Sequence, residues 1–571
     1  MSEPSPASQA LGSVLEQYWR RKVDRDPFLS LRLGMRVAQL PDVSFEHVER
    51  EAEFARPLLS ELASIRLDEL GHDDRLTLQV LQRDLEVDVK APQVFWHHFQ
   101  VAPFQSPIPL FEEVLSRLPL ETDDQLDEYL DLVDQWPAFI DKITANIKEQ
   151  RRRRILIPQE ELRLITPYLA SFLREFEQHS FWVADERLSA VDRRRRERFQ
   201  SRLAHAIRDR VRPPFGKLLE TIGREYFAAA PEKVGLHQYP DGESVYQLMI
   251  RRYTSLDLAP EDIHRIGLDE VGRLEEKVID ATRRMGLRAD SLPAAFEQLQ
   301  AHPRTYVSTR EEIGVRLAGY MQRADEALPR YFLRLPATPC RIEPLPPERG
   351  LAETFGLYRE PTAAAPFGCY YYNSSAPRQT PLLSAADLIY HELMPGHHMQ
   401  IARQAEAPDL HPYRRNCYVD IFGDGWAEYA ASFAEEMGLY DDPFDYCGRM
   451  VQEIFMAARL VVDTGMNGFG WSLGRAADFL RGHIFESEAH IHSECLRYAC
   501  DMPAQSLIYS LGFQAMKRLR ARAEQALSGA FDIKRFHETI LVHGSLPMTA
   551  LESHVEWFIE QEHTPRSDSG R

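Results

Sequence analysis

The stretch SAADLIYHELMPGHH, residues 384–398, decides how the centre of this chain folds. Ser384, with Asp387 three residues later, has the pattern of a capping box, so we expect a helix to begin directly after the serine. Pro395 lacks the N–H that would continue this helix and pushes the preceding residue out of helical geometry. The sequence therefore predicts a helix that carries the pair His391-Glu392 and breaks just beyond it.

Adjacent histidine and glutamate on a helix are typical of zinc hydrolases, in which two histidines hold the ion and the glutamate accepts a proton from water. The usual second histidine comes four residues after the first, where this chain has Pro395. In an unbroken helix His397 would point about 120° away from His391, and His398 would lie roughly 10 Å further along the axis. A distortion at the proline and Gly396 would bring His397 to the same ion. We therefore expect His391 and His397 as ligands, with His398 as the alternative.

A second segment, GDGWAEYA at residues 423–430, opens another amphipathic helix and supplies the acidic ligand that a zinc site needs. Asp424 and Glu428 are one helical turn apart and can face the same way. One of them could bind the metal while the other orients a histidine. We expect Zn²⁺ with Asp424 as third ligand and Glu428 as the alternative. Asp424 could instead be only an N-cap, and Glu428 a solvated helix residue.

The composition excludes several classes of protein. With 571 residues, 44% of them hydrophobic, the chain can bury a large core. Its net charge of −19 disfavours nucleic acid and anionic membranes as partners, and the arginine runs 151–154 and 193–196 are expected to be solvated, charge-mixed helix faces. Six cysteines without a C-x-x-C pair indicate reduced thiols. No signal peptide or long apolar run is evident, so we expect a cytoplasmic protein without an obligatory protein partner.

Periodicity predicts a mainly α fold. Leu126, Tyr129, Leu130 and Val133 form a helical stripe, and a similar one covers residues 263–278. Strand character is confined to residues 340–343 and 368–373. Prolines 344, 346 and 347, followed by residues 348–350, mark the clearest change in sequence composition. We expect a helical lobe at residues 1–337 and a lobe with a small sheet and the metal site at 338–571, joined as one unit.

The pattern H-E-x-x-P-G-H-H-x-Q at residues 391–400 resembles that of a bacterial family of unknown function, numbered 885. Further resemblance covers the whole chain, at residues 26–28, 33–34, 246–253, 263–267, 331–336 and 541–551. That family is similar to the mostly α-helical zinc peptidases of the thimet-oligopeptidase and carboxypeptidase Taq type. The resemblance implies a large two-lobed helical fold with the metal at the bottom of a deep channel.

The resemblance also assigns roles to single residues. It implies His391 and His397 as metal ligands, Glu392 as general base, and Asp424 at a position where relatives carry glutamate. Relatives resembling the stretch 461–467 carry histidine at Asn467, which can donate a hydrogen bond to a substrate but cannot carry a proton. Relatives also have P-G-Q where this chain has Pro503-Ala504-Gln505. The shorter aspartate requires a closer helix, a bridging water or a weaker metal site.

Three single residues and one segment are further candidates for substrate contact. Tyr498 and Tyr509 could donate hydrogen bonds to a tetrahedral oxyanion. Arg497 could pair with a substrate carboxylate. Residues 370–373, including Tyr372 and Asn373, could form an edge strand that binds a peptide backbone. Each of these could instead serve only packing, as a buried strand or as ordinary salt bridges.

The leading hypothesis is a zinc-dependent hydrolase, most simply a metallopeptidase that cleaves short peptides with Glu392 as general base. One alternative keeps the metal but changes the substrate to a small non-peptide amide or a biosynthetic intermediate. Another is a non-catalytic binding protein with a degenerate site, suggested by the departures at Asp424, Asn467 and Ala504.

Overall fold

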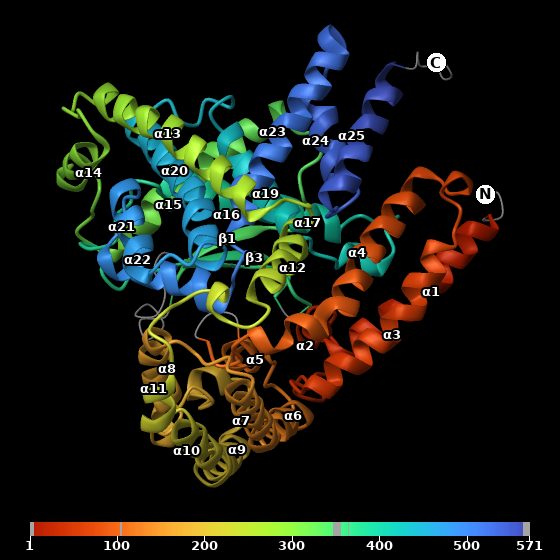
Figure 1. Ribbon diagram of the computed structural model, residues 1–571, viewed down its shortest axis with the longest axis vertical. Helices are drawn as coiled ribbons and strands as arrows, with labels where there is room; N and C mark the ends of the chain where they lie inside the picture. Colours follow the sequence, from red (N-terminus) through yellow and green to blue (C-terminus); the bar gives the residue numbers. More distant parts are fainter. Residues whose placement is uncertain (1–4, 103–105, 346–355, 364, 564–571) are drawn as a thin grey trace.

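The computed structural model describes residues 5–102, 106–345, 356–363 and 365–563. The chain is built mainly of α-helices around one small sheet, which confirms the predicted fold class (Figure 1). In the described part of the chain, one continuous hydrophobic core extends from α1 (Pro6–Arg25) to α25 (Met548–His563). Elements on both sides of position 337 contribute to this core. The division into lobes and the deep channel stay predictions.

The first eleven helices make up an arm and the lower part of the view in Figure 1. The arm, in red and orange, contains α1, α2 (Pro27–Arg32), α3 (Phe45–Ala63) and α4 (His72–Val94). The lower part contains α5 (Pro107–Arg117), α6 (Asp123–Val133), α7 (Trp136–Arg152), α8 (Gln159–Ser171), α9 (Arg193–Ala206), α10 (Arg212–Thr221) and α11 (Arg224–Ala229). All four apolar residues of the predicted stripe in α6 are buried, which confirms it.

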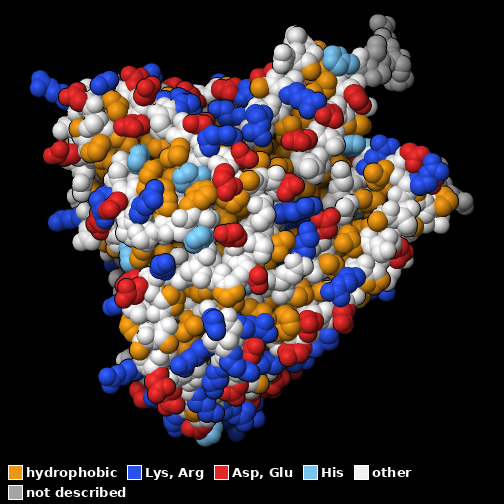
Figure 2. All heavy atoms as spheres, viewed as in Figure 1, with side chains coloured by type: hydrophobic (Ala, Val, Ile, Leu, Met, Phe, Trp, Pro, Cys, Tyr) orange, Lys and Arg blue, Asp and Glu red, His pale blue; other side chains and the backbone are white. Residues whose placement is uncertain are grey.

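The two arginine runs lie at the ends of lower helices and mix with acidic side chains, as predicted. Figure 2 shows blue and red side chains interleaved over this part of the surface. Arg193 lies 2.7 Å from Glu197, and Arg195 lies 2.7 Å from Asp123. These are exposed ion pairs on a solvated face, of a kind that contributes little to stability.

The remaining helices form the upper part of the view and surround the candidate site. They are α12 (Gly242–Thr254), α13 (Pro260–Arg284), α14 (Leu292–Ala301), α15 (Arg310–Ala327), α16 (Ala385–Glu392), α17 (His397–Ala405), α18 (Pro412–Arg415), α19 (Asp420–Phe433), α20 (Pro443–Asn467), α21 (Leu473–His483), α22 (Glu488–Leu496), α23 (Leu507–Leu527), α24 (Ile533–Val542) and α25. Helix α19 crosses α23 where two glycines meet: a Cβ on Gly425 would lie 2.7 Å from the Cα of Gly512. This close approach holds Asp424 and Glu428 of α19 next to α23.

The sheet has three strands in the order β1-β3-β2, formed by β1 (Cys340–Pro344), β2 (Gly356–Arg359) and β3 (Gly368–Tyr372). Strand β3 pairs in parallel with β1, with Cys340 opposite Gly368, and antiparallel with β2. The predicted strands at 340–343 and 368–373 are thus confirmed, but the prediction that residues 370–373 form an edge strand is wrong. Strand β2, which the sequence did not predict, covers that edge. The predicted break at residues 346–350 lies outside the described residues.

The cysteines and the apolar helices bear on two expectations drawn from the composition. All six cysteines are free, as the absence of closely spaced pairs predicts. Within the described ranges, no helix is both long and apolar enough to span a membrane. Five of the six thiols are buried, and Cys340 is partly exposed.

Candidate metal centre and catalytic cavity

The predicted break at Pro395 is confirmed and forms a tight turn. Helix α16 ends at Glu392, and α17 begins at His397 after a turn that contains the cis Met394–Pro395 bond. A Cβ at Gly396 would lie 1.8 Å from the carbonyl oxygen of His391, so glycine is required there. The indole N–H of Trp426 donates to the carbonyl of Pro395 at 3.0 Å. The turn is therefore fixed against α19, the helix that carries Asp424.

Helix α16 begins after Ser384 as predicted, but the predicted capping box is wrong. The Ser384 side chain caps no helix N–H, and its hydroxyl donates to the carbonyl of Gly448 at 3.2 Å. The carboxylate of Asp387 accepts from Arg449 and from Tyr440, each at 3.0 Å. A buried guanidinium forms a stronger, charge-assisted hydrogen bond than a backbone amide, so it determines where this carboxylate points.

The turn brings the three predicted ligands together. One possible ligand atom from each of His391, His397 and Asp424 lies within 4.8 Å of the other two. The two imidazole rings stand at 89° to each other with centroids 4.7 Å apart, and Nε2 of His397 lies 3.6 Å from Oδ1 of Asp424. These side chains could hold one metal ion.

Glu428, the alternative ligand, lies behind His391. Its Oε1 is 3.1 Å from Nδ1 of His391, and its Oε2 accepts from Arg449 at 3.0 Å. Burial alone would lower the pKa of His391, but the Glu428 carboxylate outweighs burial and raises that pKa to about 9. Burial opposes ionisation of Glu428, yet His391 and Arg449 hold its pKa below the ordinary value. With Nδ1 facing this carboxylate, Nε2 of His391 is the nitrogen left for a metal.

His398, the alternative second ligand, faces the sheet instead. Its Nδ1 lies 2.9 Å from the hydroxyl of Tyr358 in β2, and its Nε2 lies 2.9 Å from the carbonyl oxygen of Thr338. A Cβ on Gly368 of β3 would lie 2.3 Å from the same ring. His398 therefore joins α17 to the sheet and is turned away from the His391–Asp424 group.

Glu392 and His397 line a cavity of about 820 Å³. The first part of the chain contributes to its wall with Phe28, Arg32, Leu33 and Arg117, and the second part with Thr338, Tyr358, Arg415 and Tyr418, among others. The Tyr418 hydroxyl lies 3.5 Å from Oδ2 of Asp424. The open space thus adjoins one candidate metal ligand, His397, and Tyr418 links its wall to Asp424.

Three predicted contacts lie at different depths: Tyr509 on α23, and Arg497 and Tyr498 in the π-helical turn Arg497–Asp501 that follows α22. The Tyr509 ring lies 6.5 Å from that of His391, next to the candidate centre. Tyr498 is fully buried one layer further back, where its hydroxyl contacts Glu494 and accepts from Arg459. Arg497 is already engaged, because it donates to Glu494 at 3.2 Å and to Gln505 at 2.9 Å.

The three remaining predicted contacts lie away from this cavity. Asn467 is fully buried, and its amide bonds the backbone of Leu236, Asp463 and Tyr498. Tyr372 and Asn373 line a separate, much smaller cavity of about 60 Å³. Of the predicted substrate contacts, Tyr509 is therefore the one that lies nearest the candidate metal ligands.

Sequence reasoning missed three arginines and one tyrosine: Arg415 and Tyr418 on the cavity wall, and Arg449 and Arg459 behind the site. Arg449 and Arg459 were visible in the sequence as charged residues among the long apolar runs of α20, which also carries Glu453 and Asp463. Such residues are rarely buried unless they are paired. That pattern could have indicated a buried polar network.

Two solved structures share the fold. A structure from Colwellia psychrerythraea, described as a "putative lipoprotein", has a TM-score of 0.92 with 24% identity and covers 98% of this chain and 100% of its own. A structure from Shewanella oneidensis, described as a "putative lipoprotein of unknown function", has a TM-score of 0.69 with 16% identity and covers 96% of this chain and 99% of its own. Since both descriptions read "putative lipoprotein", the expected cytoplasmic location stays a prediction. No curated protein matches the sequence.

The family resemblance inferred from the motif at residues 391–400 is confirmed by the comparison with family models. The model of a family described as bacterial proteins of unknown function, DUF885, matches residues 27–555. That range includes His391, Glu392, His397 and Asp424, together with every described helix from α2 to α24. The chain therefore belongs to the DUF885 family of bacterial proteins.

Proposed function

We propose that the protein is a zinc-dependent hydrolase, most simply a peptidase that cleaves short peptides. The observation that carries this proposal is the meeting of His391, His397 and Asp424 beside Glu392, at the surface of a large cavity. Two imidazoles and one carboxylate are a donor set that catalytic zinc sites use. Glu428 supports the proposal, because a carboxylate behind a metal-binding histidine fixes the orientation of its ring.

The spacing of His397 and Asp424 is compatible with one shared ion. Bonds from zinc to nitrogen or oxygen are about 2.0–2.2 Å long, so ligand atoms around a tetrahedral ion lie roughly 3.3–3.6 Å apart. Nε2 of His397 and Oδ1 of Asp424 are 3.6 Å apart, so the shorter aspartate reaches far enough. A bound zinc ion would supply Lewis acidity, polarising a carbonyl and lowering the pKa of water.

Glu392 is the proposed proton carrier. It follows His391 on α16 and faces the cavity, and no described Lys or Arg forms an ion pair with it. Its carboxylate is therefore free to take a proton from water that attacks a substrate amide, and then to deliver that proton to the leaving nitrogen.

Two tyrosine hydroxyls are candidates to stabilise negative charge on the attacked carbonyl oxygen. Tyr418 lies beside Asp424, and Tyr509 lies beside His391. Arg459 stacks over the Tyr509 ring at 4.8 Å, which places positive charge behind it. One such donor is typically worth about 3 kcal/mol of activation free energy.

Metal content is the first test. Elemental mass spectrometry should find about one zinc ion per chain in the purified protein. The His391→Ala/His397→Ala double variant should contain almost none. His205→Ala is the control, because this histidine is exposed and far from the centre in sequence. A protein that cannot be loaded with zinc would favour the non-catalytic alternative.

Cleavage of a mixed library of short peptides is the second test. Wild type should cleave members of the library, Glu392→Gln should leave them intact while keeping its zinc, and the exposed Glu435→Gln should behave as wild type. Full zinc occupancy with an intact library would contradict the peptidase proposal and favour a small non-peptide amide as substrate.

A further inference from the structure

One wall of the 820 Å³ cavity is formed by α18 and the residues that follow it, from Pro412 to Tyr418. Glu392 and His397 lie on the same cavity. A substrate whose scissile bond lies next to Glu392 would therefore extend along this wall. The side chains of the wall then determine which substrates are held.

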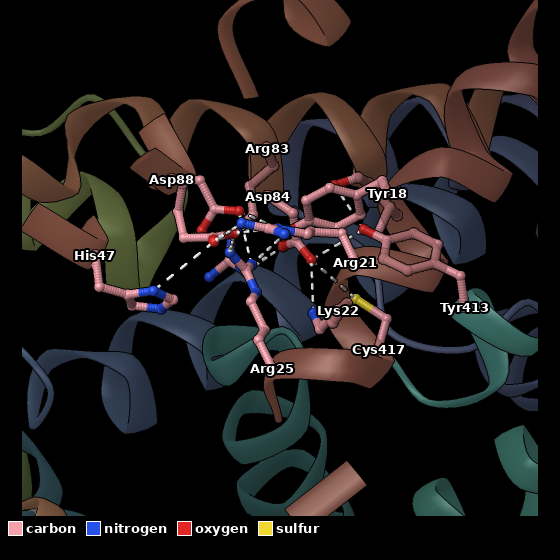
Figure 3. Close-up of polar contacts among 12 residues, drawn as sticks. Tyr18, Arg21, Lys22, Arg25, His47, Arg83, Asp84, Asp88, Tyr413 and Cys417 are labelled. Carbon is pink, nitrogen blue, oxygen red and sulfur yellow. Dashed lines mark hydrogen bonds and ion pairs between the residues drawn. The ribbon is translucent and has the colours of Figure 1, made fainter. Parts of the chain in front are cut away.

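The backbone on both sides of Arg415 is fixed. Figure 3 shows Tyr413 and Cys417 directed into a buried polar cluster around Asp84, to which the Tyr413 hydroxyl donates at 2.9 Å. The Gln404 side chain donates to the carbonyls of Arg414 and Cys417, each at 2.6 Å. Residue 415 is thus held in place by its neighbours.

The Arg415 side chain differs from these neighbours because it has no partner of its own. Among the described residues, its guanidinium forms no ion pair and no hydrogen bond, and its Nε is buried. The other two arginines on the cavity wall are compensated: Arg32 lies 2.6 Å from Glu360, and Arg117 lies 2.8 Å from Glu113. Arg415 therefore presents an uncompensated positive charge to the cavity.

We propose that Arg415 is a substrate-binding residue that pairs with a carboxylate of the substrate. The guanidinium matches a carboxylate through two parallel N–H···O bonds, and burial strengthens such a pair. Arg497, which the sequence suggested for this role, is occupied by Glu494 and Gln505. The inference rests on the proposed function and specifies its substrate class: short peptides with a carboxylate held at Arg415.

Two carboxylates could fill this position, the C-terminal carboxylate of the peptide or the side chain of an aspartate or glutamate. Both offer the same chemistry to the guanidinium. Three acetylated alanine tetrapeptides separate them: one with a free C-terminus, one with an amidated C-terminus, and an amidated one with an internal aspartate.

Binding is measured by calorimetry on the zinc-loaded Glu392→Gln protein, which should hold peptides without cleaving them. The free-acid peptide, the aspartate peptide or both should bind about 10- to 100-fold more tightly than the neutral amidated peptide, the range for a hydrogen-bonded charge. Adding Arg415→Ala or Arg415→Gln should abolish this preference, and Arg415→Lys should restore part of it. Adding Arg288→Ala, which removes an exposed arginine elsewhere, should leave the preference unchanged.

The two proposals fail differently in this experiment. Equal binding of all three peptides, with wild type still cleaving them, overturns the role of Arg415 and leaves the peptidase proposal intact. A carboxylate preference that survives Arg415→Ala and Arg415→Gln likewise overturns the role of Arg415 and leaves the peptidase proposal intact. If zinc-loaded protein neither binds nor cleaves any of the peptides, the peptidase proposal and the carboxylate site are both overturned.

Discussion

Two buried polar clusters in this protein contain similar residue types but differ in their charge balance. In the cluster of Figure 3, Asp84 accepts from Lys22 at 3.1 Å and from Arg83 at 2.9 Å, and Glu51 is paired with Arg21 and Arg25. In the candidate metal centre, Arg449 reaches Glu428 behind His391, but no described Lys or Arg pairs with Asp424 or Glu392.

The difference shows how a structural cluster can be distinguished from a candidate ligand site. Burial would raise the pKa of Asp84, but Lys22 and Arg83 hold it at about 2, as expected for a carboxylate whose charge is matched. No Lys or Arg in the described part of the chain pairs with Asp424, and the positive charge that the raised pKa of His391 provides is a proton that a metal ion would displace. This arrangement supports the proposal that an external cation completes the site.

The largest expected effect is on stability and comes from breaking the matched cluster. Asp84→Asn should lower the free energy of unfolding by about 3–5 kcal/mol, because it leaves buried cations uncompensated. Urea denaturation measures this change. Asp68→Asn, in an exposed pair with Arg66, should leave the denaturation midpoint nearly unchanged. A stable Asp84→Asn protein would mean that water reaches the cluster.

A third cluster consists of His490, Glu486 and Glu494 and lies next to Arg459. Its charge balance depends on pH. Burial would lower the pKa of His490, but Glu486 and Glu494 outweigh burial and raise it to about 9. Because its pKa is raised in the folded protein, protonated His490 stabilises the fold fully at pH values below 6.5, the pKa of this histidine in the unfolded chain. This stabilisation is lost as the pH rises through about 9. The loss should reach about 3 kcal/mol. His490→Gln should flatten the stability profile between pH 6.5 and 9, and the exposed His205→Gln should not.

A smaller effect, on zinc affinity, is expected at Glu428, which contacts both Arg449 and His391. Glu428→Gln should weaken zinc binding about 10- to 100-fold, because it removes the carboxylate that orients His391. Competition with a chelator measures the affinity. The control is Glu453→Gln, because Glu453 also contacts Arg449, at 3.5 Å, but does not contact His391. Equal losses in both variants would indicate that Arg449, rather than the orientation of His391, controls the site.

The smallest effect on stability is expected at Asp424. In metal-free protein Asp424→Asn should change the free energy of unfolding by less than about 1 kcal/mol, because no cation is left unpaired. Zinc content should nevertheless fall sharply in the same variant. Asp424→Glu should hold or raise zinc affinity, and a large loss of metal there would contradict the assignment of Asp424 as a ligand.

What the sequence predicted correctly is local in the chain. The stripe in α6 and the break after Glu392 depend on spacing and on proline, so they could be recognised without knowing the fold. The turn that Pro395 and Gly396 define is also local, but Asp424 joins the two histidines only because α19 packs against that turn, where Trp426 donates to the carbonyl of Pro395.

What the sequence did not predict depends on contacts between distant segments. Strand β3 is central only because β2 covers it, and the four residues of β2, Gly356–Arg359, are too few to show a strand pattern of their own. Asp387 bonds an arginine 62 residues away instead of capping its own helix. The free charge of Arg415 becomes visible only when the partners of Arg32 and Arg117 are known. Contacts between segments that are far apart in the chain leave no periodic signal in the sequence.

The composition of the cavity wall has a consequence for biosynthesis. The wall joins Phe28 and Arg32 to His397 and Tyr418, and Arg414 beside it donates to the carbonyl of His543. Domains generally fold as units while the chain emerges from the ribosome. Here the cavity cannot close until the chain has been translated at least as far as Tyr418, long after Phe28 has emerged. The candidate site would thus be completed late in synthesis.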